Sequence, residues 1–152
     1  MAIVTFYRND PNAPKTTMPA HLGANAIITC NGKLLLEKRR DCDIWGLVGG
    51  GVKKYETEIQ AITREIYEEL GLRVAPDKFK KLAVYGEPGR IAVYRDGSIW
   101  RMVIVVFGLE LEEEPNLRIS NESKELRFFT KEELKDIEIV VTHSDIVEEL
   151  FG

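Results

Sequence analysis

The chain has 152 residues, of which 44% are hydrophobic, so it is long enough to bury the core of about one domain. Its net charge of −4 and pI near 5.3 argue against a general nucleic-acid-binding surface, because such surfaces carry a basic excess. The two cysteines, Cys30 and Cys42, fit neither a metal site nor a secreted disulfide framework. No stretch reaches the roughly 18 apolar residues of a membrane span, and we expect a cytoplasmic protein without membrane contact.

The N-terminal part predicts strands. Residues 1–6 are apolar enough for a short strand, and residues 10–15 (DPNAPK) are rich in turn formers, so residues 1–20 are expected to form an extra strand and a linker. Two apolar runs follow at 24–29 and 33–38. The Asn-Gly pair between them is the strongest short signal for a β-hairpin.

Residues 57–70 predict a helix of about four turns, because they lack Pro and Gly and include strong helix formers. Gly71 follows where a left-handed C-terminal cap belongs. Four aliphatic side chains share one face of this helix and should pack on the core: Ile59, Ile62, Ile66 and Leu70.

The neighbouring face of this helix carries three carboxylates, those of Glu65, Glu68 and Glu69. Like charges this close destabilise a helix by a few tenths of a kcal/mol per pair, so a neutralising cation is expected. Mg²⁺ or Mn²⁺ suits them, because hard cations take oxygen ligands and Mg²⁺ shares its shell with substrate phosphates. A glutamate-rich face can also be simply solvated, and the residues before the helix favour the metal.

Those residues complete a spaced motif. The run 49–51 is three glycines, which let backbone carbonyls or amides approach an ion or a phosphate. Arg64 can pair with Glu68 one turn along the helix or with Glu56 across the loop. The segment reads G-x5-E-x7-R-E-U-x-E-E-x-G-U, where U is aliphatic. All nine defined positions are matched, by Gly50, Glu56, Arg64, Glu65, Ile66, Glu68, Glu69, Gly71 and Leu72.

This motif resembles the Nudix box, the signature of hydrolases that cleave a nucleoside diphosphate linked to another moiety. The resemblance implies an α+β fold, an α/β/α sandwich with a mixed β-sheet, as one domain over residues 1–152. It implies that water attacks a pyrophosphate phosphorus while Mg²⁺ or Mn²⁺ holds the phosphate oxygens. The implied metal ligands are Glu65, Glu69, Glu68 and a loop carbonyl, which we assign to Gly50.

The resemblance also assigns supporting roles. Arg64 is expected to reach Glu56 and orient the metal ligands, with Glu56 placed beside the substrate and the waters of the metal. The chain departs from the family at one point. The usual approach to the box is W-x-x-P-G-G, and here Val48 stands where a proline normally stiffens the strand exit. We expect a less rigid loop and unaffected carboxylates.

The second half of the chain is predicted to be rich in strands. The expected strands are 81–85, 91–94, 100–111 and 126–129, with a polar loop at 112–123. A helical turn is expected at 131–134, and Ser144 is expected to cap a final helix that ends at Phe151.

The general base is sought in two places, because Nudix enzymes take it either from the box or from a late loop. Glu122 and Glu125 lie in the late polar loop, and Glu68 is the candidate within the box. Loop glutamates are also commonly solvated bystanders.

Cationic and aromatic residues supply candidates for binding the substrate. Arg39 is preferred for the phosphates, since it ends the second hairpin strand near the box, and Arg101 is also assigned to the substrate. Further surface-type cations and possible base-stacking rings are Arg40, Lys53, Lys54, Arg90, Tyr85, Tyr94 and Trp100. His21 and His143 have no recognisable partner spacing and are interpreted as structural or surface residues.

The partner is expected to be a small nucleoside diphosphate derivative, and a homodimer is possible. ADP-ribose pyrophosphatases of the family tend to carry a proline about sixteen positions beyond the box, and Pro88 lies there. ADP-ribose or a nucleotide sugar is therefore slightly favoured. The alternatives are a MutT-like nucleoside triphosphate pyrophosphohydrolase and a regulator that binds a nucleotide without hydrolysing it; the complete set of carboxylates favours hydrolysis.

Overall fold

The computed structural model describes residues 3–152, so the first two positions of the strand expected at 1–6 lie outside the described residues. None of the helices in the described part is long and apolar enough to cross a membrane. The elements follow in the order β1 (Ile3–Arg8), β2 (His21–Cys30), β3 (Lys33–Arg39), β4 (Trp45–Gly46), β5 (Val48–Gly51), α1 (Glu58–Leu70), the short 3₁₀-helix η1 (Pro76–Lys78), β6 (Lys80–Tyr85), β7 (Arg90–Tyr94), β8 (Ile99–Leu111), β9 (Ser123–Phe129), η2 (Glu133–Asp136) and α2 (Val141–Leu150).

The strands form a mixed sheet. Its path is β1-β7-β8-β2-β3-β4, and β5, β6 and β9 pair with β2, β8 and β3. The strands β2 and β8 run parallel along the whole of β2, whereas the other pairings are antiparallel. The two long parallel strands therefore form the centre of the sheet, and β5 branches from β2 at the end where the glycine run lies.

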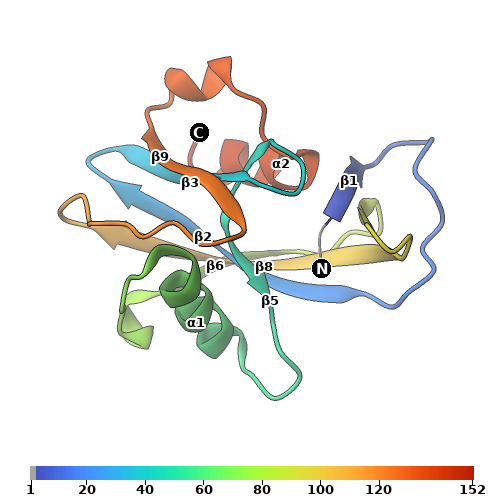
Figure 1. Cartoon of the computed structure of the whole chain (residues 1–152), viewed down its shortest axis with the longest axis horizontal. Coiled ribbons are helices and arrows are strands. Elements are labelled where there is room, and N and C mark those ends of the chain that lie inside the picture. Colours follow the sequence, from blue (N-terminus) through green and yellow to red (C-terminus); the bar gives the residue numbers. More distant parts are fainter. Residues whose placement is uncertain (1–2) are drawn as a thin grey trace.

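Helices cover opposite faces of the sheet, as the α/β/α expectation requires (Figure 1). On one face, Leu34 and Leu36 of β3 pack in a cluster with Ile146 of α2. The intervening Leu35 points to the other face and packs in a cluster with Ile66 of α1. This alternation follows from the two-residue period of a strand, and it explains why the run at 34–36 is apolar on both sides.

The helix α1 matches its sequence signals closely. Thr57 is the N-cap and forms a capping box with Gln60, and Gly71 adopts the left-handed conformation with φ 73°. Of the predicted apolar stripe, Ile62, Ile66 and Leu70 are fully buried and Ile59 is half-buried.

The predicted hairpin around Asn31 and Gly32 is confirmed. Asn31 and Gly32 have φ angles of 52° and 75°, the two positive values that a type I′ turn needs. The predicted strands after residue 20 are all present, with ends that extend by at most three residues. The segments 45–46 and 48–51 are strands that the sequence did not reveal, because a glycine run is more typical of a loop.

The expectation that Ser144 caps the last helix is wrong. The helix α2 begins at Val141, and Ser144 lies inside its first turn, with its hydroxyl directed at the Val141 carbonyl at 3.3 Å. The start is set by pairing with a distant strand, since the Val140 amide donates to the Trp45 carbonyl at 2.9 Å. No side chain caps this end, so the local sequence gave no true N-cap signal.

Candidate active site

A cavity of about 490 Å³ lies where β2, β3, β5 and α1 meet the loop before β9. Its acidic wall contains Glu37, Glu65 and Glu122, beside the glycines of β5. Its other walls carry aromatic rings, cations and polar groups, including Phe6, Tyr94, Arg39, Arg40, Arg95, Asn25, Thr142 and His143. The cavity thus combines a carboxylate end with an aromatic and cationic end.

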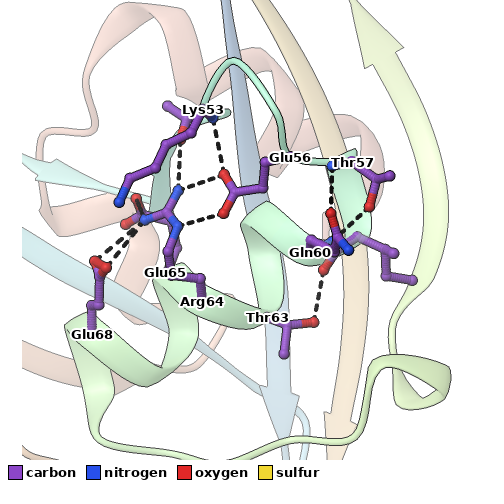
Figure 2. A network of polar contacts seen from close by, with 10 residues as sticks. Lys53, Glu56, Thr57, Gln60, Thr63, Arg64, Glu65 and Glu68 are labelled. Carbon is purple, nitrogen blue, oxygen red and sulfur yellow. Dashed lines mark hydrogen bonds and ion pairs between the residues drawn. The ribbon is translucent and has the colours of Figure 1, made fainter.

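Arg64 organises the carboxylates of the motif (Figure 2). Its guanidinium binds Glu56 through two bonds, with Nε–Oε2 at 2.6 Å and Nη2–Oε1 at 2.9 Å. It also donates to Glu65 Oε1 at 2.7 Å and to the Gly51 carbonyl at 2.9 Å. Glu68 is a weaker partner, with both oxygens at 3.3 Å. Of the two pairings open from sequence, the one with Glu56 is dominant, because a bidentate charged pair is stronger and better oriented.

The pair also holds the loop before α1. Glu56 accepts a hydrogen bond from the Lys53 amide at 2.9 Å, and the hydrogen bond from Arg64 lowers the pKa of Glu56 to about 2. Glu56 therefore stays ionised. It is not among the residues that line the cavity. In this structure its contacts are those of a residue that positions Arg64.

Glu65 and the glycine strand lie in direct contact. A Cβ added at Gly50 would fall 2.6 Å from the Glu65 carboxyl group, so any residue but glycine would displace that side chain. Glu65 is buried, and this burial raises its pKa although Arg64 acts in the opposite direction. The Gly50 backbone and the Glu65 carboxylate are therefore held side by side at the cavity wall.

A second acidic group is formed by Glu69 and Glu37. Glu69 is buried and accepts a hydrogen bond from Ser120 Oγ at 2.7 Å. Glu37 of β3 is also buried and accepts from Ser123 Oγ at 2.6 Å. Burial raises the pKa of both carboxyl groups, and the charge of Glu37 raises the pKa of Glu69 further. Glu122 adds to this repulsion from the loop before β9.

Glu37 was not among the residues predicted from sequence. Its signal is a charged residue directly after three leucines, inside a strand that is buried on both faces. Glu37 is buried, and the nearby charge of Arg39 lowers its pKa less than burial raises it, which marks Glu37 as a candidate functional residue.

The donor set fits a divalent cation. Glu37, Glu65 and Glu69 are all buried with raised pKa values, so the site has more carboxylates than its cations neutralise. Their ligand atoms are hard oxygens, which suit Mg²⁺ or Mn²⁺. Within residues 3–152 no three acidic, histidine or cysteine side chains already converge as a ligand set. Arg64, Ser120 and Ser123 hold these carboxylates instead.

The remaining predicted residues divide into those at the cavity and those away from it. Arg39 lines the cavity, binds Asp41 through two bonds of 2.9 and 2.7 Å, and stacks over Phe6. Glu122 also lines it, whereas Glu125 pairs with Arg127 on the same strand, outside the lining.

Three further candidates lie outside the cavity lining. Glu68 is exposed on the surface of α1. Pro88 is exposed in the turn between β6 and β7, and Arg101 donates to the Gly86 carbonyl in the same turn. Of the three rings considered for stacking, Tyr94 alone is among the lining residues; Tyr85 instead donates to Glu149 at 2.6 Å.

A mixed sheet between two helices, with the motif helix bringing Glu65 to the wall of a cavity, is the architecture of the Nudix class. The chain belongs to the NUDIX domain family, whose model matches residues 19–150. The nucleoside triphosphatase NudI of Enterobacter sp. (strain 638) is 30% identical over 97 residues, which make up 62% of this chain and 67% of that protein. The chain spans 48% and 32% of the length of two other curated relatives that it matches.

Solved structures share the fold. A MutT NUDIX hydrolase from Burkholderia pseudomallei is 25% identical with a TM-score of 0.69, over 88% of this chain and 98% of that one. The NUDIX domain of Shewanella oneidensis NrtR, solved with ADP ribose, is 18% identical with a TM-score of 0.69, over 92% and 90% of the two chains. At that identity the second likeness concerns the fold alone.

Proposed function

We propose that this chain is a pyrophosphohydrolase that cleaves the diphosphate link of a nucleotide derivative with the help of Mg²⁺ or Mn²⁺. One observation carries the proposal: the complete motif is folded around Arg64, so that Glu65 and the Gly50 backbone meet at the wall of a cavity large enough for a nucleotide. Family membership and the name of the NudI relative support the same reaction class.

The metal would be held by Glu65, Glu69 and the Gly50 carbonyl, with Glu68 available from the exposed edge of the helix. When bound, it neutralises charge that develops on the phosphate oxygens and makes water a better nucleophile. Glu37 extends this acidic site from the sheet side. Because it is buried beside Glu69, it adds negative charge that favours a dication over a single Lys or Arg.

The chain's own residues would position the rest of the substrate. Arg39, Arg40 and Arg95 line the cavity and can bind phosphate oxygens that the metal does not reach. Tyr94 and Phe6 offer ring faces for a base. Glu122 is better placed than Glu125 to accept a proton from the attacking water, since Glu122 lines the cavity whereas Glu125 lies on β9 outside the lining.

The nucleotide class has two candidates. ADP-ribose was favoured from the position of Pro88, which lies exposed and outside the cavity lining. A nucleoside triphosphate is supported by the NudI relative and by the arginines at the cavity, which match a longer phosphate chain. We therefore propose ADP-ribose or a nucleotide sugar as the first candidate substrate and a nucleoside triphosphate as the second.

The test is a panel of ADP-ribose, nucleotide sugars and nucleoside triphosphates, each incubated with the protein and Mg²⁺ and followed by product identification. We expect nucleoside monophosphate as a product and no turnover with EDTA. Glu69→Gln is the matched control, because it keeps the shape of the side chain and removes its charge. Tight nucleotide binding without hydrolysis of any compound would contradict the proposal and favour a nucleotide-binding regulator.

A further inference from the structure

The short segment from Trp45 to Gly51 changes partner strand at Leu47. Before this residue, β4 pairs with β3, with Gly46 opposite Glu37. After it, β5 pairs with β2, with Val48 opposite Ala26. Leu47 lies between the two strands and belongs to neither, so its own peptide groups must find partners outside the sheet or remain unsatisfied.

Two buried side chains provide those partners. The Leu47 amide donates to His143 Nδ1 at 3.0 Å, and the Leu47 carbonyl accepts from Asn25 Nδ2 at 3.2 Å. Asn25 lies on β2 and is 7% exposed, whereas His143 lies on α2 and is 5% exposed. The backbone of Leu47 is thus held from two elements, by His143 of α2 as acceptor and Asn25 of β2 as donor.

The chemistry of His143 suits this contact. Burial, with the nearby cations Arg39 and Arg90, lowers the pKa of His143 to about 3, against a smaller opposite effect of Asp145. The ring is therefore neutral near pH 7 and its Nδ1 lone pair is free to accept, which places the single ring proton on Nε2. The His143 ring is tightly packed here, because a Cβ added at Gly46 would lie 3.2 Å from its Nδ1.

The clamp lies three residues before the proposed metal carbonyl. From Leu47 the chain runs through Val48 and Gly49 to Gly50, where a Cβ would fall 2.6 Å from the Glu65 carboxyl group. Gly49 has φ +150°, and a Cβ there would lie 2.1 Å from the Ala24 carbonyl, so this stretch packs directly on β2. A displacement of the Leu47 peptide would therefore be carried to Gly50.

We propose that Asn25 and His143 are positioning residues that fix the Leu47 backbone, and through it the Gly50 backbone beside Glu65. In this chain they supply the stiffness that the missing proline at position 48 would otherwise give. The proposal rests on the metal site of the proposed function. It extends that site to two side chains that approach it from β2 and α2.

The test combines a metal-independent measurement with metal affinity. Hydrogen exchange of the Leu47 amide is measured in EDTA, and Mn²⁺ affinity is measured by titration, for the wild type, His143→Leu, His143→Asn and Asn25→Leu. Asn can keep an acceptor near the position of Nδ1, whereas Leu removes the donor of Asn25 at a similar size and adds no charge to the cavity. Ile146→Val, in the same helix and away from the cavity lining, is the control for a mild loss of core packing.

We expect the Leu47 amide to be protected in the wild type and to exchange about five- to tenfold faster in His143→Leu, the effect of losing one hydrogen bond. Mn²⁺ affinity should fall about 10- to 100-fold in His143→Leu and Asn25→Leu, as is usual when a group that orients a metal ligand is lost. His143→Asn should bind within about threefold of the wild type, and Ile146→Val should be unchanged.

Two results would overturn the inference. One is rapid exchange of the Leu47 amide in the wild type, which requires no variant to fold. The other is wild-type Mn²⁺ affinity in a folded Asn25→Leu or His143→Leu protein. Failure of the wild type itself to bind Mn²⁺ contradicts the proposed function instead, and the exchange measurement still decides whether the Leu47 peptide is clamped.

Discussion

Replacing Glu37 by Gln is expected to stabilise the metal-free protein at alkaline pH. Burial raises the pKa of Glu37 from 4.5 to about 7, so the folded chain holds this proton more tightly than the unfolded chain. The stability that the protonated group contributes is fully present below about pH 4.5 and is lost as the pH rises through about 7. The pKa change corresponds to a loss on the order of 3 kcal/mol.

The geometry makes Gln a clean substitute at this position. Its amide oxygen can still accept the hydrogen bond that Ser123 Oγ donates to Glu37, and it carries no charge to repel Glu69. Urea unfolding in EDTA should show the free energies of unfolding of Glu37→Gln and the wild type diverging between pH 5 and 8. The variant should become more stable, by up to about 3 kcal/mol.

Mg²⁺ should reverse part of this difference, because a cation binds the ionised carboxylates of the folded wild type. Ser144→Ala, on the first turn of α2 and outside the cavity lining, serves as a control with no expected change in pH dependence. Identical pH dependence of the free energy of unfolding in Glu37→Gln and the wild type would refute the reasoning. It would mean that Glu37 is solvated or already neutralised.

Three further predictions address the helix and the loop. Glu69→Gln should lower kcat at least about a hundredfold at saturating Mg²⁺ with folding retained, as steady-state kinetics and circular dichroism can show; near-normal turnover would exclude it as a ligand. Ile66→Ala should cost about 2 to 5 kcal/mol in a urea melt, because the side chain is fully buried under α1, and a loss below about 0.5 kcal/mol would contradict this packing. Glu122→Gln should lower kcat about 10²- to 10⁴-fold and remove the acid limb of the pH–rate profile, whereas Glu125→Gln should be nearly silent. Full activity of both would move the base into the motif, to Glu68.

Local signals explain what could be predicted from the sequence. The ends and the buried stripe of α1 depend on neighbours within one or two turns, and Thr57, Gln60 and Gly71 carry those signals themselves. The type I′ hairpin is equally local, since two residues determine it. The carboxylate face of α1 followed from the same periodicity, so the acidic side of the site was visible in one short segment.

The remaining parts of the site depend on contacts between distant residues. Glu37 meets Ser123 across 86 positions, and His143 meets Leu47 across 96. Contacts at such separations produce no periodic pattern in the sequence, so they could not be predicted from it. The prediction of where α2 begins was wrong for the same reason, because Val140 is held by a hydrogen bond to Trp45 rather than by a capping side chain.

The folded arrangement also explains why so acidic a site can exist before a cation binds. Glu56 and Arg64 form a pair that stays charged, and Arg64 extends it to Glu65. The deeper carboxyl groups of Glu69 and Glu37 accept from serine hydroxyls and also act on each other, so protonation lowers their repulsion instead. The site therefore has one half oriented by a fixed cation and another half whose charge depends on pH. Burial also raises the pKa of Glu65, so a metal ion bound at the proposed site must displace protons from Glu37, Glu69 and Glu65. Its binding should therefore release protons and tighten as the pH rises.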